Sequence, residues 1–349
     1  MRGKISGDLV GFASKNLDQR FVMNTPPYIV VTGGAGFIGS ALIRHLNELG
    51  ISNIIIVDNL GTDGKWVNLV GKRFADIIPI EQLFKWLAER PAEEIAGFIH
   101  LGACSSTVEQ DACYLLENNY RYTRKLAEYA LKHNKRFVYA SSAATYGDGS
   151  LGFVDEHDQL EILQPLNMYG YSKHMFDLWA KRENVLDKMV GLKYFNVFGP
   201  NEGHKGRMAS VVTKMVPNVQ QEGVIRLFKS TEPHNFGDGD QKRDFIYVKD
   251  AVRMTYAFFA NDKGGIYNVG RGVAETWNSL ATAVFTGLDA KHNIQYIEMP
   301  QDLIGKYQNY TCADMTKTRI ALGADSSCTS LENSVIEYVK DYLVPGKTW

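Results

Sequence analysis

The sequence predicts an α/β protein with a doubly wound parallel sheet and a smaller C-terminal α/β domain for substrate. Three observations support this fold class. Strand-like and helix-like runs alternate over the first two hundred residues, a glycine-rich turn joins the first strand to the first helix, and the alternation loosens after residue 200. With 349 residues the chain exceeds the usual size of one compact domain. We therefore expect two parts that share a cleft.

The predicted strands are short apolar runs rich in β-branched residues. They are 28–32, 54–57, 98–101, 137–140 and 190–195. Between them, apolar residues recur with the helical period from Ile38 to Leu49, just ahead of Gly50, and again over 114–133 and 169–185. Strands that alternate with helices imply a parallel sheet with helices on both faces.

Composition excludes several classes of function. The 38 basic and 39 acidic residues give a formal net charge of -1, which argues against a nucleic-acid partner. The longest apolar runs are strand-sized, so no membrane span is expected. The four cysteines form no CxxC pair and share no zinc-ligand spacing with the eight histidines. We therefore expect free thiols and no metal site.

The glycine-rich turn indicates a dinucleotide site of the Rossmann type. Gly33 and Gly36 would let the backbone approach a pyrophosphate at the helix N-terminus, and Gly39 would let helix and strand pack closely. Asp58 ends the next strand, where an acid can hold the adenosine ribose. Asp58 favours NAD, whereas Lys65 could bind the 2′-phosphate of NADP. The residues alone leave that choice open.

A catalytic constellation follows the strand 137–140. Tyr169 and Lys173 are four residues apart and share one face of a helix, and Ser142 lies at the end of the preceding strand. A tyrosine has an ordinary pKa near 10, so a base at neutral pH needs a shift of roughly three units. A lysine ammonium and a positive nicotinamide ring could supply that shift.

The turn, Ser142 and the Tyr169–Lys173 pair together resemble the extended branch of the short-chain dehydrogenase/reductase superfamily over 28–349, including 243–250 and 267–270. Within it, the segments 58–60, 102–107 and 196–210 resemble the ADP-L-glycero-D-manno-heptose 6-epimerase family. This resemblance implies transient oxidation at C6 of the heptose by bound NADP, with Lys205 as a second base. It also implies a cytoplasmic homo-oligomer that supplies heptose for the lipopolysaccharide core.

The resemblance implies the remaining site residues as well, and its match at Lys65 favours NADP. The catalytic residues are Tyr169, Lys205, Lys173 and Ser142. The cofactor residues are Gly33, Gly36, Phe37, Ile38, Gly39, Asp58, Asn59, Lys65, Leu101, Gly102, Ala103, Cys104, Ser105, Asn118, Lys173 and Val197. The substrate residues are Asn196, Arg207, Lys214, Phe228, Arg243 and Tyr307.

Leu101, Arg207 and Lys214 depart from the family pattern, and residues 232–241 enlarge a loop near the expected nucleotide. These departures bear on which sugar nucleotide binds. One alternative is therefore another nucleotide-sugar epimerase, for example one acting at C4. A dehydratase is disfavoured because Ala143 and Ala144 stand where acidic residues are expected. A non-catalytic NADP-binding regulator would have no need of the catalytic constellation.

The expected domain organisation has three parts. Residues 1–27 form an N-terminal extension without the apolar core of a secretory signal, and we expect it to be flexible. Residues 28–200 and 242–270 form the NADP-binding domain. Residues 201–241 and 271–349 form the substrate-binding domain.

Overall fold

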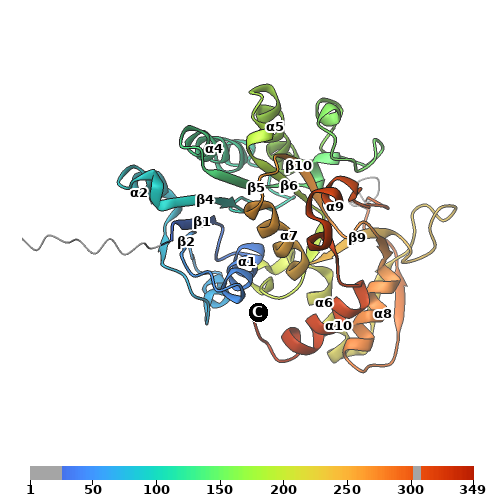
Figure 1. Ribbon diagram of the computed structural model, residues 1–349. Helices are drawn as coiled ribbons and strands as arrows, with labels where there is room; N and C mark the ends of the chain where they lie inside the picture. Colours follow the sequence, from blue (N-terminus) through green and yellow to red (C-terminus); the bar gives the residue numbers. More distant parts are fainter. Residues whose placement is uncertain (1–25, 302–307) are drawn as a thin grey trace, which may run out of the picture.

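The computed structural model describes residues 26–301 and 308–349 (Figure 1). Nearly all of the expected N-terminal extension, and Tyr307 among the expected substrate residues, lie outside these residues. Within the described part, no helix is both long and apolar enough to cross a membrane.

A seven-stranded parallel sheet forms the centre of the molecule. Its strands are β1 (Tyr28–Thr32), β2 (Ile54–Val57), β3 (Asp76–Ile78), β4 (Ile95–His100), β5 (Arg136–Ser142), β6 (Val190–Tyr194) and β10 (Gly265–Val269). They lie in the order β10-β6-β5-β4-β1-β2-β3, and every pair is parallel. This order confirms the predicted doubly wound sheet.

Alternate residues of each strand face different helices, because side chains of a strand point to opposite faces. Ile29 and Val31 of β1 belong to one core with α1 (Phe37–Glu48) and the start of α7 (Val248–Ala260). Val30 belongs to a second core with α4 (Tyr122–Lys132) and α5 (Met168–Arg182). Both faces of the sheet are therefore covered, which explains why its strands are continuous apolar runs.

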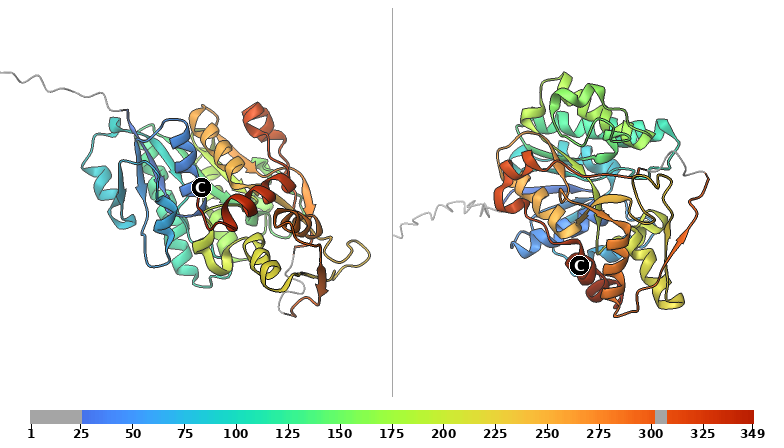
Figure 2. Two further views of the ribbon diagram at one scale, coloured as in Figure 1. Left: turned by 90° about the horizontal axis from the view of Figure 1, so that it is seen from below. Right: turned by 90° about the vertical axis from the view of Figure 1, so that its right-hand side faces the viewer.

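The second part of the molecule has its own core. It contains the three-stranded sheet β7 (Asn196–Phe198), β9 (Lys242–Tyr247) and β11 (Ala274–Thr276), and the pair β8 (Ile225–Phe228) and β12 (Ile294–Ile297). Around it pack α6 (Val211–Glu222), α8 (Trp277–Gly287), α10 (Leu331–Glu337) and the π-helix η10 (Tyr338–Leu343). These yellow to red segments gather on one side of the sheet, and the chain then returns to α1 (Figures 1 and 2).

Strand β9 lies between the two parts. The sequence assigned residues 242–270 to the cofactor domain, but β9 pairs with β7 and β11 in the small sheet. Phe245 and Tyr247 face the core of the second part, whereas Ile246 faces the core of the central sheet. Helix α9 (Thr316–Leu322) packs near β10.

The helical run expected at 114–133 is three helical segments. They are α3 (Ala112–Leu115), the π-helix η4 (Leu116–Arg121) and α4. Sequence periodicity did not reveal the π-helix, because a π-helix widens the helix locally without requiring different residue types. Strand β3 and helix α2 (Leu83–Ala88) were not predicted either.

Candidate active site

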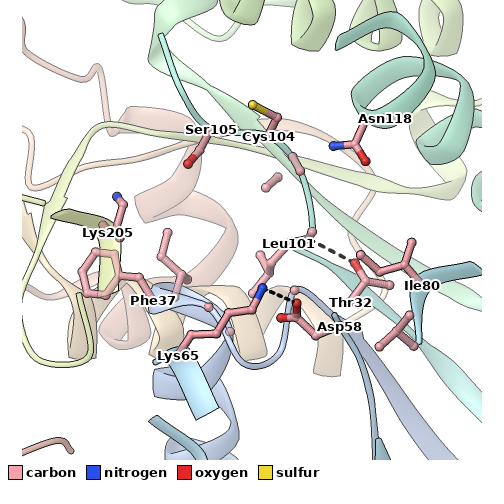
Figure 3. A pocket seen from close by; sticks show the side chains of 18 of the residues that line it. Thr32, Phe37, Asp58, Lys65, Ile80, Leu101, Cys104, Ser105, Asn118 and Lys205 are labelled. Carbon is pink, nitrogen blue, oxygen red and sulfur yellow. Dashed lines mark hydrogen bonds and ion pairs between the residues drawn. The ribbon is translucent and has the colours of Figure 1, made fainter. Parts of the chain in front are cut away.

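A cavity of about 380 Å³ lies where the strand order reverses between β1 and β4 (Figure 3). Ligands of doubly wound sheets bind at this point, outside the carboxyl ends of the strands. The lining includes Gly33, Gly36, Phe37, Ile38, Gly39, Asp58, Lys65, Leu101, Gly102, Ala103, Cys104, Ser105, Asn118, Ala140, His204 and Lys205. Most of the residues that the sequence placed at the cofactor therefore meet in one cavity.

The glycine turn lies directly against the end of β4. Gly33 has a φ of +67°, and a Cβ there would lie 2.7 Å from the backbone of Gly102. A Cβ on Gly39 would lie 2.1 Å from the carbonyl oxygen of Gly33. Both positions therefore need glycine, one for the close approach of two loops and the other for the packing of α1 on the turn.

The N-terminus of α1 faces the cavity without a side-chain cap. Gly36 precedes the helix, no described side chain caps it, and the first turn has no acidic residue. Phe37, Ile38 and Gly39 of that first turn line the cavity. Backbone N–H groups at a free helix N-terminus favour an anion, so the turn fits the pyrophosphate of a dinucleotide.

Asp58 and Lys65 form an ion pair in the cavity wall. Lys65 Nζ lies 2.8 Å from one carboxylate oxygen, and the other accepts a 2.9 Å hydrogen bond from the Ala35 N–H. Asp58 thus holds the glycine turn as well as the lysine. Asn59 instead donates to Glu81 at 2.7 Å and accepts from the Ile80 N–H. Neither Asn59 nor Val197 is part of the lining, and their cofactor roles stay predictions.

Tyr169 and Lys173 lie in the first turns of α5, which begins after Asn167. The Asn167 side chain caps the helix by accepting from the Gly170 N–H at 2.8 Å. Lys173 Nζ donates to the carbonyl oxygen of Ala140 at 2.8 Å, and Ala140 lines the cavity. Lys173 therefore lies directly beside the cavity, and Tyr169 precedes it by about one helical turn.

Burial acts on both of these side chains. It raises the pKa of Tyr169, although a hydrogen bond with Ser142 lowers it in part. Burial lowers the pKa of Lys173 to about 8, against the charge of Asp177, which raises it. Tyr169 thus holds its proton more firmly than an ordinary tyrosine, and Lys173 loses its proton more readily than an ordinary lysine.

A buried ion pair joins α5 to the central sheet. Lys193 of β6 and Asp177 of α5 are 2.8 Å apart, and both side chains are 0% exposed. Asp177 also accepts from Tyr139 at 2.9 Å and Ser141 at 2.8 Å, while Lys193 donates to Thr145 at 2.6 Å. The pair fixes α5 against β5 and β6.

Lys205 reaches the cavity from the short helical segment η8 (Gly203–Met208). Its ammonium group lies 5.3 Å from the centre of the Phe37 ring, on the side of the cavity away from Asn118 (Figure 3). Burial lowers the pKa of Lys205, and the charge of Glu202 opposes this shift. Two expected catalytic groups, Tyr169 and Lys205, therefore come from separate elements.

Two buried polar side chains support the loops of the site and were not assigned from the sequence. Asn119, on the π-helix, exchanges two 2.9 Å hydrogen bonds with the backbone of Cys104 and donates to Ser172 on α5 at 3.0 Å. Glu202 is buried and accepts two 2.6 Å bonds from Ser210 and one of 3.0 Å from Tyr338. Both lie in polar stretches of the sequence, and Glu202 is part of the segment 196–210 that carries the family resemblance.

The five expected substrate residues that the structure describes lie outside the cavity lining. Asn196 begins β7, opposite Phe245 on β9, and Arg243 is buried two residues earlier on that strand. Phe228 ends β8. Lys214 donates to the backbone carbonyl of Arg207 at 2.9 Å. Their contacts with substrate stay predictions.

Within 26–301 and 308–349, no group of three or more His, Cys, Asp or Glu side chains could hold a metal ion.

Comparison with known proteins identifies the family. A family model described as the NAD dependent epimerase/dehydratase family matches residues 29–270. An ADP-L-glycero-D-manno-heptose-6-epimerase of Nitratidesulfovibrio vulgaris (strain DP4) is 51% identical over 316 residues, which cover 90% of this chain and 97% of the relative. The protein of that name from Fusobacterium nucleatum is 45% identical over 90% of this chain and 98% of its own length.

Solved structures show the same architecture. The Helicobacter pylori ADP-L-glycero-D-manno-heptose-6-epimerase matches with a TM-score of 0.75 at 26% identity, over 90% of this chain and 96% of that one. A UDP-N-acetylglucosamine 4-epimerase from Methanobrevibacter ruminantium M1 also gives 0.75 at 26% identity, over 92% and 99%. The family description indicates a nicotinamide cofactor. The chain belongs to the NAD-dependent epimerase/dehydratase family and, within it, to the ADP-L-glycero-D-manno-heptose-6-epimerases.

Proposed function

We propose that this protein interconverts ADP-D-glycero-D-manno-heptose and ADP-L-glycero-D-manno-heptose, by transient oxidation at C6 with bound NADP, to supply heptose for the lipopolysaccharide core. The names of relatives 51% and 45% identical to it support the substrate. The observation that carries the mechanism is the placement of Tyr169 and Lys205. Lys205 of η8 lines the cavity, and Tyr169 is on α5, where Lys173 donates to Ala140 in the cavity wall.

Inversion of a secondary alcohol through a ketone needs two proton transfers. The hydroxyl proton leaves to a base as the C6 hydrogen leaves as hydride, and a proton then returns to oxygen after the sugar has turned over. The nicotinamide ring supplies the hydride acceptor and donor. A single base on one face cannot be well placed for both poses. We assign Tyr169 and Lys205 to the two faces.

The pKa shifts of Lys205 and Tyr169 suit different roles in the two proton transfers. Burial lowers the pKa of Lys205. Lys205 therefore forms the neutral amine, which can accept a proton, more readily than an exposed lysine does. Tyr169 has a raised pKa and begins as a proton donor. A protonated Lys173 close by favours the tyrosinate, so Lys173 tunes Tyr169.

Three parts of the chain would hold the cofactor. The turn at Gly33 and Gly36 would bind the pyrophosphate, and Asp58 would bind the adenosine ribose. Lys65, which already neutralises Asp58 at 2.8 Å, would bind a 2′-phosphate. At the substrate, the Arg243 guanidinium would bind the diphosphate through two donors.

The choice of cofactor is tested with Lys65→Ala. Removing the lysine leaves the Asp58 carboxylate facing the 2′-phosphate, so NADP should bind more weakly by roughly ten- to a hundred-and-fifty-fold and NAD by much less. Titration of apo protein with each dinucleotide measures both. Lys188→Ala, at an exposed lysine, is the control. Equal weakening of both cofactors would remove Lys65 from the 2′-phosphate site.

The protonation state of Lys173 is tested in the ligand-free protein. Competitive acetylation at a series of pH values, read by mass spectrometry, should give a midpoint near pH 8, well below the ordinary value of 10.5. In Asp177→Asn the midpoint should move lower, because the Asp177 charge raises it. A midpoint near the ordinary value would contradict the burial argument.

This titration also affects stability. Between the folded pKa near 8 and the unfolded value of 10.5, the unfolded state binds more protons at Lys173. Burial of the charged Lys173 therefore lowers the free energy of unfolding by its full amount below about pH 8. This loss of stability disappears as the pH rises through this window.

The two-base mechanism is tested with Tyr169→Phe and Lys205→Met. Each should lower kcat for ADP-heptose by about 10²- to 10⁴-fold, because each removes one proton transfer, while NADP binding stays within about threefold. Tyr171→Phe, two residues along the same helix and 47% exposed, should retain activity. Normal turnover by either site variant would refute its assignment.

The same assay separates the alternatives. A C4 epimerase is supported by the equal structural match to the UDP-N-acetylglucosamine enzyme. It would turn over that UDP-sugar and leave ADP-heptose unchanged. Tight NADP binding without turnover of either sugar nucleotide would indicate a regulator.

A further inference from the structure

Asn68 lies between the glycine turn at 33–39, called the cofactor turn below, and the segment that carries Lys205. It is part of the short helix η1 (Lys65–Leu69), and only 4% of its surface is exposed. None of the assignments made so far uses it. Its side chain contacts both loops, which are far apart in sequence.

The amide nitrogen of Asn68 has three close polar neighbours. It lies 3.1 Å from the carbonyl oxygen of Ala35, from that of Asn201 and from Nδ1 of His204. Carbonyl oxygens only accept, so the atom facing them is the nitrogen, and its two hydrogens go to these two oxygens. His204 Nδ1 is therefore a close neighbour of the amide and not a third acceptor. Burial lowers the pKa of His204, which is consistent with a neutral ring.

On one side, Asn68 holds the cofactor turn. Ala35 lies within that turn, and its N–H already donates to Asp58 at 2.9 Å. Asn68 binds the carbonyl group of the same residue at 3.1 Å. Both backbone polar groups of Ala35 are therefore fixed by side chains that follow β2.

On the other side, Asn68 holds the start of the Lys205 segment. Asn201 has a φ of +78°, in the left-handed region that few residues other than glycine adopt. Its side chain accepts from the Trp349 N–H at 2.8 Å and donates to Ser40 at 3.1 Å. Glu202 fixes the far end of the segment through Ser210.

We propose that Asn68 is a positioning residue of the epimerisation: by donating to Ala35 and Asn201 together, it sets the position of Lys205 relative to the cofactor turn. This inference rests on the proposed function, in which Lys205 transfers a proton at C6. A displacement of about 1 Å between a catalytic group and the reacting atoms can cost a hundredfold in rate. The bonds of one buried amide are therefore enough to matter.

Asn68→Asp tests the donor role with almost no change of shape. A carboxylate cannot donate to the two carbonyl oxygens and repels them, so kcat should fall roughly ten- to a hundredfold. Asn68→Ala removes the donor without adding repulsion and should be milder. If Asn68 only filled space, the isosteric Asp variant would be the milder one. Asn293→Asp, at an exposed amide that donates to Gly223, is the matched control.

A double-mutant cycle with Lys205→Met shows whether Asn68 acts through Lys205. The kcat loss caused by Asn68→Asp should shrink to less than about twofold when Lys205 is already absent. The same fold-loss in both backgrounds would overturn the proposal, as would an unchanged kcat in Asn68→Asp. If Asn68→Asp does not fold in a thermal melt, the cycle is run with Asn68→Ala and judged by the same criterion.

Failure of the inference is distinct from failure of the proposed function. If Lys205→Met is fully active, or wild type does not convert ADP-heptose, the proposed function is wrong. If Lys205→Met lowers kcat as predicted and the Asn68 loss is the same in both backgrounds, only the role of Asn68 is wrong.

Discussion

The candidate active site depends on one buried ion pair, between Lys193 on β6 and Asp177 on α5. Neither side chain is exposed, and a charge in such a place must be paired and hydrogen-bonded. Tyr139 and Ser141 of β5 complete the partners of Asp177. Removing one partner from such a pair typically costs about 3–5 kcal/mol. The pair therefore fixes α5, and with it Tyr169 and Lys173, against the strand that ends at Ser142.

The same ion pair also affects the pKa of Lys173. The charge of Asp177, one helical turn beyond Lys173, opposes the effect of burial on the Lys173 pKa. The Lys205 segment has its own acidic support in Glu202, which likewise opposes the effect of burial on Lys205. Burial thus lowers the pKa of each of the two lysines proposed to act, and the charge of one carboxylate limits each shift.

The sequence was informative where local residue types determine local geometry. The turn at Gly33 and the spacing of Tyr169 and Lys173 identified the ends of β1 and α5, and the structure has both elements there. The sequence could not reveal that Asn68 and Asn119 join separate loops, because hydrogen bonds between distant segments leave no periodic pattern. The pairing of β9 with β7 and β11 likewise depends on tertiary packing. Tyr307 lies outside the described residues.

Turnover in heavy water shows whether the sugar is inverted by transient oxidation. The C6 hydrogen would leave as hydride and return from the nicotinamide, so it would not exchange with solvent. The ADP-heptose product should carry no deuterium at the inverted carbon, measured by mass spectrometry and proton NMR after many turnovers. Stoichiometric deuterium at that carbon would require carbanion chemistry. That result would contradict the roles of Tyr169, Lys205 and the nicotinamide together.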